Sequence, residues 1–146
     1  MKKTIILLAL LASPVAAESG YLVSIYDGDT MTIQTGSENV IVRLYGVDAP
    51  ELSQPSGESA RALLASLVGS RCTFQPQGRS YGRVVAKVRC DGFDLALTLV
   101  TEGLAWVSQR YTSDPTLIRA EKTARQARKG LWRASNPIPP SRWRMK

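Results

Sequence analysis

Histidine is absent from this chain of 146 residues. Its absence removes the side chain that most often acts as a general base near neutral pH, and the commonest protein ligand of transition metals. Cysteine occurs only twice, and two thiols do not complete a tetrahedral zinc site. Any chemistry that the protein performs must therefore use carboxylates, arginine, lysine or tyrosine.

Long apolar runs are lacking as well. The most apolar run, residues 5–12, is far shorter than the roughly 20 residues that a membrane-spanning helix needs. Lys2 and Lys3 precede it and small residues follow it, which is the pattern of a secretory signal peptide. We therefore predict a signal peptide at residues 1–17, cleavage after Ala17, export to a periplasm or the medium, and no membrane span in the mature protein.

Acidic residues are fewer than basic residues, 12 against 19, which gives a formal charge of +7. Removal of residues 1–17 takes away Lys2 and Lys3, so the mature chain keeps 17 basic residues and a charge of +5. A basic domain of this kind suits polyanionic partners. The same charge is also typical of a soluble protein with a solvated basic surface.

The two cysteines, Cys72 and Cys90, stand on either side of a glycine-containing loop predicted at residues 75–82, and strand-like residues flank that loop. An oxidising compartment favours a disulfide between them across a hairpin. The alternative is a pair of free thiols buried in the core.

Strand and helix patterns alternate along the chain. β-Branched and aromatic residues between turn signals predict five strands, at residues 21–26, 30–35, 40–47, 71–74 and 83–90. Helical spacing of apolar residues predicts three helices, at residues 57–68, at residues 95–102 and from Pro115 to Gly130, with Asp114 as the N-cap of the last.

This order of elements predicts one α+β domain, mainly β, at residues 18–135. We expect a small, closed antiparallel barrel of the OB type with five strands and three helices, because closure removes exposed sheet edges. The proline-rich, basic tail at residues 136–146 is expected to lie extended, with Trp143 holding it to the surface.

Charged residues cluster near two of the predicted strands. The segment 27–30, Asp-Gly-Asp-Thr, is by itself typical of a hairpin turn. Arg43 lies within an apolar strand, and Asp48 and Glu51 follow that strand. An arginine in such a strand is costly unless an anionic group meets it, so the acids and the arginine are expected to lie together.

Strand register links two of these acids. If the hairpin turns at residues 37–38, Asp29 lies opposite Gly46 and about 7–8 Å across the diagonal from Asp48. Two carboxylates, a backbone carbonyl near Ala49 and several waters would form an all-oxygen site, which suits calcium or magnesium. The alternative is a network of ion pairs that only ties the strands together.

Three segments taken together resemble the staphylococcal nuclease (thermonuclease) family. They are residues 27–30, 43–51 and 81–83, in the same order and with similar spacing. The resemblance extends over about residues 21–132, nearly the whole mature domain, and includes Lys-Gly-Leu-Trp at 129–132. Each segment is a weak signal alone, whereas the set is specific.

The resemblance implies a role for each matching residue. Asp29 and Asp48 are expected to bind Ca2+ through their side chains, and Ala49 through its main-chain carbonyl. Family members often have threonine where Ala49 stands, which a main-chain ligand tolerates. The loop at residues 75–80 is the main departure from the family pattern, because it looks short.

The catalytic roles come from the same resemblance. Glu51 matches the proposed general base of the family, and Arg43 and Arg83 match its two phosphate-binding arginines. Tyr81 resembles a residue that contacts a substrate phosphate. Tyr81 and Tyr111 are also suited to stacking on bases of any sequence.

The resemblance implies a Ca2+-dependent nuclease, the predicted signal peptide makes it an exported one, and we expect it to be a monomer. Such an enzyme hydrolyses the bond to the 5′ oxygen in DNA and RNA, with a preference for single strands, and leaves 3′-phosphate ends. One alternative is a non-catalytic nucleic-acid-binding OB module, because folds of this type often bind strands without cutting them. Another is an interaction module that binds calcium for structural reasons alone.

Overall fold

The computed structural model describes residues 16–146, so the predicted signal peptide at residues 1–17 lies outside the described residues except for its last two. The first strand, β1 (Glu18–Ile25), begins at the residue that follows the predicted cleavage position. Among the helices of the described part, none is both long enough and apolar enough to cross a membrane.

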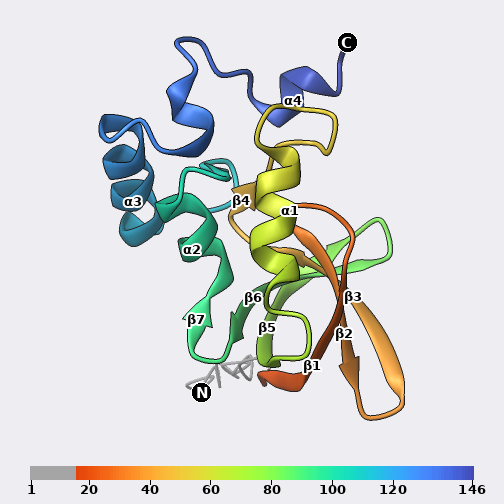
Figure 1. The fold of residues 1–146 in the computed structure, drawn as a ribbon. Helices are drawn as coiled ribbons and strands as arrows, with labels where there is room; N and C mark the ends of the chain where they lie inside the picture. The colour runs from red at the N-terminus through yellow and green to blue at the C-terminus, as the bar shows by residue number, and fades with distance from the viewer. Residues whose placement is uncertain (1–15) are drawn as a thin grey trace, which may run out of the picture.

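Five strands form a closed barrel (Figure 1). They are β1, β2 (Thr30–Thr35), β3 (Glu38–Leu44), β5 (Arg71–Ser80) and β6 (Arg83–Cys90). Neighbours in the order β3-β2-β1-β5-β6 pair antiparallel, and β3 pairs with β6 to close the barrel. The α+β, mainly β, OB-type barrel predicted from the sequence is therefore confirmed.

The closing pair differs from the expectation of an antiparallel barrel. Val42, Arg43 and Leu44 of β3 pair in parallel with Val84, Val85 and Ala86 of β6. The two strands are separated in the sequence by a helix and by β5, so β6 returns to the barrel in the direction of β3. This parallel contact fixes where the end of β3 lies.

Alternate residues of the strands fill the barrel, as the two-residue period of a strand requires. Leu22, Ile33, Leu44, Phe74 and Val88 are each at most 1% exposed, and all belong to one core cluster. The helix α1 (Gly57–Ala65) adds its buried residues to the same cluster. The core thus holds both the end of β3 and α1 in place.

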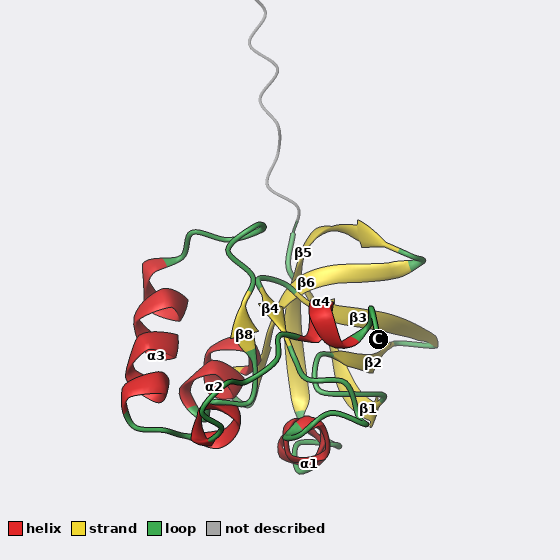
Figure 2. Ribbon diagram, turned by 90° about the horizontal axis from the view of Figure 1, so that it is seen from above, coloured by secondary structure: helices red, strands yellow, loops and turns green. Residues whose placement is uncertain are grey.

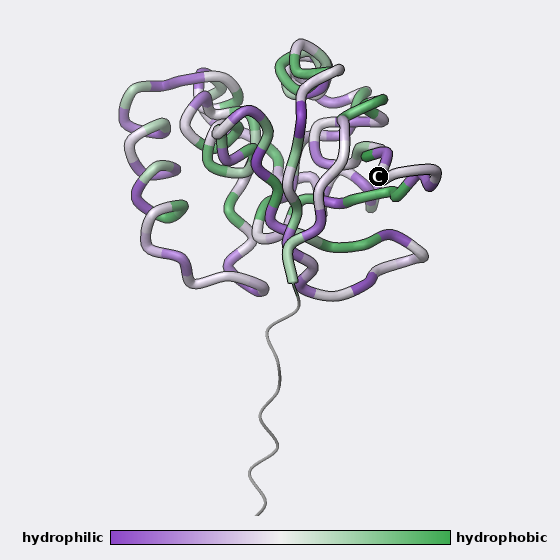
Figure 3. Tube along the Cα trace, turned by 90° about the horizontal axis from the view of Figure 1, so that it is seen from below, coloured by the Kyte–Doolittle hydropathy of each residue, from purple (hydrophilic) through white to green (hydrophobic). Residues whose placement is uncertain are grey.

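Two helices, α2 (Leu95–Thr101) and α3 (Pro115–Gln126), pack against each other beside the barrel (Figure 2). Asp94 caps α2 by accepting a hydrogen bond from the Leu97 amide, 3.0 Å away. Asp114 caps α3 in the same way, and Pro115 occupies its first turn, as predicted. Short hydrophilic and hydrophobic stretches alternate along α3, at the left of Figure 3, because only one face of it is buried.

Short elements complete the described chain. They are β4 (Val47–Asp48), β7 (Phe93–Asp94), β8 (Trp106–Val107), the 3₁₀ helix η1 (Gly130–Arg133) and α4 (Pro140–Trp143). Strand β4 pairs antiparallel with β8, with Asp48 opposite Trp106. Trp106 packs edge-on against Trp132 of η1, with ring centroids 4.4 Å apart. Val47 and Val107 belong to the main core cluster and Trp106 packs against a second, smaller one, so both clusters hold the segment that carries Asp48.

The prediction of a loop at residues 75–82 is wrong, because β5 continues to Ser80. A bulge between Pro76 and Gly78 shifts the register, and the hairpin then turns at Tyr81 and Gly82. Both turn residues have positive φ, 48° and 77°. A tight turn of this geometry matches the twist of the strands on either side, so pairing is regular from the bulge to the tip of the hairpin.

The expectation of an extended tail at residues 136–146 is also wrong in part. The chain is irregular at residues 137–139 and then forms α4, a single helical turn. Pro140 stands in the first turn of that helix, where its missing amide and fixed φ are compatible with helix formation. Trp143 does hold the tail to the surface, since its ring nitrogen donates to Ser53 Oγ at 3.2 Å.

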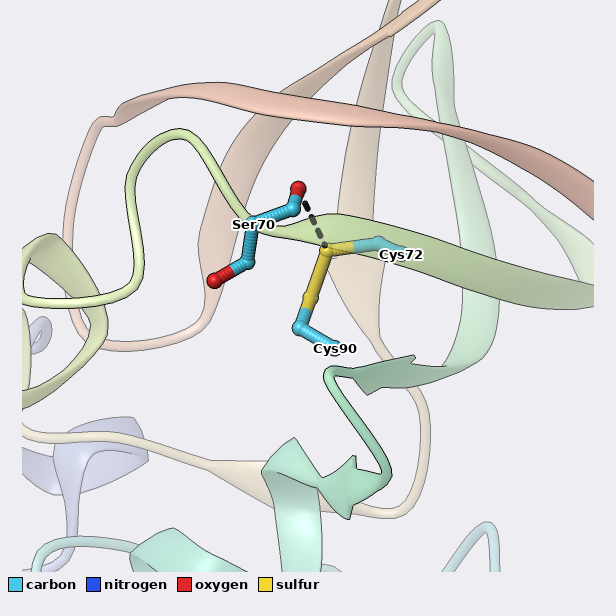
Figure 4. Close-up of a disulfide and its surroundings, with 3 residues drawn as sticks. All are labelled: Ser70, Cys72 and Cys90. Carbon is cyan, nitrogen blue, oxygen red and sulfur yellow. Dashed lines mark hydrogen bonds between the residues drawn. A yellow bond between two sulfur atoms is a disulfide. The ribbon is translucent and has the colours of Figure 1, made fainter.

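The predicted disulfide between Cys72 and Cys90 is confirmed (Figure 4). The two residues lie directly opposite each other on β5 and β6, and both are fully buried. The alternative of two free thiols is therefore excluded. Because disulfides persist mainly in oxidising environments, this bond indicates a compartment outside the cytoplasm.

We expect the disulfide to stabilise the fold mainly by restricting the unfolded chain. The two cysteines are 18 residues apart, and loops of about this size contribute roughly 3 kcal/mol. Denaturant unfolding of the oxidised protein, the reduced protein and the variant Cys72→Ala/Cys90→Ala measures this contribution. The variant should resemble the reduced protein and should not respond to reductant. Equal stability of all three would contradict the expectation.

Candidate functional site

The hairpin of β2 and β3 sets the position of the predicted site, and its register differs from the predicted one. The turn lies at Gly36 and Ser37 rather than at residues 37–38, because Gly36 takes a positive φ of 57° at the first corner. Asp29 therefore lies opposite Leu44, whose amide donates to its carbonyl at 2.8 Å, and not opposite Gly46.

Gly28 lets the turn before β2 approach its neighbours closely. A Cβ at this position would lie 2.7 Å from the Cβ of Ala49 and 2.8 Å from the Cβ of Ala60. These distances are too short for a side chain at residue 28, so only glycine fits here without a shift of its neighbours. The Asp29 amide donates to Asp27 Oδ1 at 3.0 Å, which holds the turn that directs Asp29 inward.

Asp29 is a buried carboxylate, with only 6% of the residue exposed. Its Oδ2 accepts a hydrogen bond from the Ala49 amide at 2.9 Å, and its Oδ1 accepts one from the Thr30 hydroxyl at 3.2 Å. Burial raises the pKa of Asp29 to about 6, although Arg43 opposes that rise. Its negative charge is thus only partly compensated by the protein.

Arg43 joins the two predicted metal-binding carboxylates. One nitrogen of its guanidinium lies 3.4 Å from Asp29 Oδ2, and the other lies 3.0 Å from Asp48 Oδ1. The same group donates to the Val47 carbonyl at 3.2 Å, so it also holds the chain between the two acids. The network of ion pairs considered as an alternative is therefore present around these residues.

Arg83, at the start of β6, reaches the same region from the other side. Its Nη1 donates to the Thr30 hydroxyl, and its Nε donates to the Ser80 carbonyl, each at 3.4 Å. Thr30 thus connects Arg83 with Asp29. Thr30 stands within the segment 27–30, but no sequence signal separates this linking role from that of an ordinary strand residue.

Glu51 lies on the loop that follows β4 and is partly exposed. Its Oε1 accepts a hydrogen bond of 2.6 Å from Arg144, and the same nitrogen of Arg144 lies 3.4 Å from Asp48 Oδ1. Glu51 and Asp48 therefore face one side chain. Burial acts to lower the pKa of Arg144, but its hydrogen bonds to Glu51 and Asp48 raise that pKa above the ordinary value.

The contact of Arg144 with the site was not anticipated from the sequence. The available signal was the spacing of Arg142, Trp143 and Arg144 in the tail, which is basic and aromatic at once. That pattern indicates that the tail can bind to an acidic surface, but it does not predict which acidic residues the tail contacts.

One cleft of about 1050 Å³ contains all of these side chains. Its acidic lining residues are Asp27, Asp29, Asp48 and Glu51, and its basic ones are Arg43, Arg79, Arg83, Arg110 and Arg144. Ala49 lines it as well. The seven residues predicted to bind metal, phosphate or bases, together with Glu51, thus share one cleft.

The two tyrosines lie at exposed positions of the same cleft. Tyr81 stands at the tip of the β5–β6 hairpin and is 97% exposed, and Tyr111 is 61% exposed. The guanidinium of Arg110 lies 5.7 Å from the centre of the Tyr111 ring. Exposed rings next to guanidinium groups can stack on planar ligands with negative charges nearby.

The donor set suits a hard divalent cation. Within residues 16–146, no three side chains of His, Cys, Asp or Glu are close enough to hold a metal ion by themselves. Two carboxylates and a main-chain carbonyl supply oxygen only, which is the preference of Ca2+ and Mg2+. The partly compensated charge of Asp29 is a further reason for a cation to bind here.

The arrangement can bind a phosphate ester. Two guanidinium groups, those of Arg43 and Arg83, border a cleft that also holds carboxylates suited to a cation and to an attacking water. A planar guanidinium group can donate two parallel hydrogen bonds to the oxygens of one phosphate, whereas the ammonium group of lysine acts as a single point charge. The cleft thus offers the groups that hydrolysis of a phosphate ester requires.

Comparisons with known proteins agree with this geometry. The family described as "Staphylococcal nuclease homologue" matches residues 41–134. A protein of Escherichia coli named as an uncharacterized endonuclease is 36% identical over 129 residues, covering 86% of this chain and 84% of that protein. The micrococcal nuclease of Shigella flexneri is 36% identical over 144 residues, covering 86% of this chain and 79% of the relative.

The barrel, the cleft and these similarities define a nuclease, an enzyme that hydrolyses the phosphodiester bonds of nucleic acids. The chain belongs to the staphylococcal nuclease family. A relative from Haemophilus influenzae, also named as an endonuclease, is 37% identical over 126 residues, with 84% of this chain and 71% of that protein covered.

We expect Asp29→Asn to stabilise the protein when no metal is present. The pKa of Asp29 is about 6 in the folded chain and 3.8 ordinarily, so the folded state holds the proton more tightly. Its contribution to stability is therefore largest below about pH 4 and is lost as the pH rises toward 6. At pH 8 with a chelator, the variant should unfold with a free energy higher by on the order of 1 kcal/mol.

Denaturant unfolding at pH 8 and at pH 4 measures the difference. The gain should fade at pH 4, where Asp29 of the parent protein is largely neutral. Asp91→Asn, at an exposed turn, serves as the control and should change stability little at either pH. A loss of stability in Asp29→Asn at pH 8 would show that the carboxylate is well compensated by Arg43.

Proposed function

We propose that the protein is an exported, Ca2+-dependent nuclease that hydrolyses DNA and RNA and leaves 3′-phosphate ends. The observation that carries this proposal is the single cleft that contains Asp29, Arg43, Asp48, Glu51 and Arg83. The family resemblance supplies the product class, and the cleft supplies the groups that the reaction requires.

Arg43 and Arg83 are assigned to the phosphate. As water attacks, negative charge grows on the equatorial oxygens of the phosphorus, and fixed guanidinium groups stabilise that charge. Arg43 is already oriented by Asp48 and by the Val47 carbonyl, and Arg83 by Thr30 and Ser80. Groups that are held in place before the substrate binds are the main source of such stabilisation, and the Val47 carbonyl still holds Arg43 when a cation takes up the two carboxylates.

Glu51 is assigned as the general base. A carboxylate serves this role in a protein without histidine if it lies within hydrogen-bond reach of the attacking water. Glu51 shares the partner Arg144 with Asp48, so it lies beside a proposed metal ligand. It takes a proton of the water as the new bond to phosphorus forms; the bond between phosphorus and the 5′ oxygen breaks, and the 5′ oxygen leaves with the bonding pair and takes up a proton from solvent to become a hydroxyl.

Asp29, Asp48 and the carbonyl of Ala49 are assigned to Ca2+. When bound, the ion supplies positive charge to the phosphate and lowers the pKa of a bound water. Asp29 is held by the Ala49 amide and the Thr30 hydroxyl, and each of its oxygens keeps lone pairs for a cation. Buried, hydrogen-bonded ligands of this kind bind in a fixed geometry.

Tyr81 and Tyr111 are assigned to the substrate outside the scissile phosphate. Their exposed rings offer stacking surfaces that accept any base, and bases are available for stacking only where a strand is unpaired. A preference for single-stranded DNA and RNA follows. The basic cleft adds a sequence-independent attraction for the backbone.

The disulfide supports export, because Cys72 and Cys90 are joined in the core of the barrel. We infer that residues 1–17 are removed as a signal peptide, that residues 18–135 form the nuclease domain, and that the mature protein acts as a monomer. Chain sequencing of the secreted protein and its sedimentation would test these three statements.

The alternative, a non-catalytic nucleic-acid-binding module, needs the basic cleft and the tyrosines but not Glu51. Arg43 also forms ion pairs with Asp29 and Asp48, which would suffice for a purely structural role. Binding of a single strand without cleavage, at any Ca2+ concentration, would favour this alternative.

We expect Glu51→Gln to lower the rate of DNA hydrolysis by roughly a hundredfold or more, since amides do not accept the proton. Chelation of Ca2+ should abolish hydrolysis by the parent protein. Release of acid-soluble nucleotides from denatured DNA measures both. Glu58→Gln, on the exposed face of α1, is the matched control and should retain the parent rate. Undiminished cleavage by Glu51→Gln would refute the assigned base.

The arginine assignments are tested by Arg43→Lys and Arg83→Lys. Each keeps the charge but replaces a planar fork by a single ammonium, so we expect losses of about a hundredfold in kcat for each. Arg61→Lys, on α1, is the control and should be near normal. Thermal unfolding separates a catalytic loss from a folding defect, because Arg43 also pairs with Asp29 and Asp48. Near-normal rates in both variants would remove these arginines from catalysis.

A further inference from the structure

The C-terminal segment, residues 138–146, folds back onto the loop that follows β4, and Figure 1 shows α4 above α1 and next to that loop. Two hydrogen bonds anchor it. Gln54 donates to the Ile138 carbonyl, and Trp143 donates to Ser53 Oγ at 3.2 Å. Gln54 also accepts from the Glu51 amide at 3.2 Å, so the anchor and the proposed base share one side chain.

Arg144 extends from this anchored turn into the cleft. Its Nη1 lies 2.6 Å from Glu51 Oε1 and 3.4 Å from Asp48 Oδ1, and its Nη2 lies 3.3 Å from Asp48 Oδ2. The guanidinium therefore contacts both oxygens of Asp48. A proposed metal ligand and the proposed base are occupied by one group of the protein itself.

Arg43 already pairs with Asp48 Oδ1, so Arg144 and a divalent cation compete for the remaining lone pairs of Asp48 and for Glu51. Both need carboxylate lone pairs, and both carry positive charge, so they repel each other when they are a few ångströms apart. A guanidinium 2.6 Å from Glu51 also takes a position that an attacking water would need. The tail in this position is thus incompatible with the catalytic arrangement proposed above.

We propose that the C-terminal segment is a built-in inhibitor of the site, held over it by Arg144 and displaced when a divalent cation binds. This inference rests on the proposed function, because it takes Asp48 as a metal ligand and Glu51 as the base. Displacement leaves Asp48 to the cation and frees Glu51 for the water. The inhibited state therefore gives way to the active one as the cation concentration rises.

The strength of the closed state is modest. The Arg144 side chain is 47% exposed, and ion pairs at such positions contribute little because solvent and salt screen them. The single turn of α4 is too short to be stable apart from its contacts. The tail should therefore open readily, and its effect on cation affinity should be a few-fold rather than a complete block.

The test compares Arg144→Ala with Arg142→Ala in the otherwise intact chain. Both remove one positive charge from exposed positions in or next to the same helical turn, but of the two only Arg144 contacts Asp48 and Glu51. Isothermal titration with Ca2+ alone should give a Kd that is roughly three- to tenfold lower for Arg144→Ala, because the closed fraction no longer reduces the affinity. Arg142→Ala should bind like the parent protein.

Hydrogen exchange provides a readout that does not depend on activity. The amides of Arg142, Trp143 and Arg144 donate to the carbonyls of Pro139 and Pro140, so they are protected while the turn is formed. Saturating Ca2+ should accelerate their exchange in the parent protein. Trp143→Ala, which removes the contact with Ser53, should accelerate exchange without Ca2+ and tighten Ca2+ binding.

The outcomes separate this inference from the proposed function. Equal Ca2+ affinity in Arg144→Ala and Arg142→Ala, with tail exchange unchanged by Ca2+, overturns the inhibitor and leaves the metal site standing. Absence of Ca2+ binding in all the proteins overturns the metal assignment, and the inhibitor with it. Tighter Ca2+ binding but slower DNA hydrolysis at saturating Ca2+ in Arg144→Ala than in Arg142→Ala would show that Arg144 serves the substrate, which also overturns the proposal.

Discussion

The ion pairs of Arg43 with Asp29 and Asp48 are the interaction on which the site depends. Each of these three groups is largely removed from water, and each would be costly without a partner. Arg43 pairs with Thr30 across β2 and with Val85 of β6, so the group that compensates the acids is fixed in the closed barrel. Barrel closure thus fixes Arg43 and Asp29, while the pairing of β4 with β8 brings Asp48 to the same guanidinium.

Arg43 does not fully compensate the negative charge of Asp29. Asp29 has a raised pKa even with Arg43 beside it, because burial outweighs the attraction. Arg43 pairs with Oδ1 of Asp48, and Arg144 covers its Oδ2. A cation and a phosphate can both be attracted to such a cleft, since both carboxylates and guanidinium groups line it. The tail is bound by the charges that the proposed chemistry uses.

Local signals in the sequence predicted most of the fold. The strands at residues 30–35 and 83–90, the Asp114 cap and the disulfide depend on periodicity, capping residues and the spacing of two cysteines, and the structure confirms them. Two turns were predicted less well. Gly36 moved the first hairpin by one position, and β5 ran on through residues expected to form a loop.

The candidate site was predicted by a combination of local pattern and family resemblance, and the predicted residues do share one cleft. The strand register that was expected to bring the two acids together was wrong. The expected diagonal between Asp29 and Asp48 relied on a register that the chain does not adopt. The two acids meet instead because β3 ends at Leu44, the chain turns through Gly46, and β4 pairs with β8.

The sequence by itself determined most of the strands and helices, the residue types available for chemistry and the family, because these depend on neighbouring residues and on short segments with a characteristic order and spacing. Tertiary structure alone decided the parallel closure of β3 on β6, the burial that raises the pKa of Asp29, and the contact of Arg144 with Asp48 and Glu51. These features join residues as far as 96 positions apart. Such contacts arise from the packing of the whole barrel, and no local pattern specifies them.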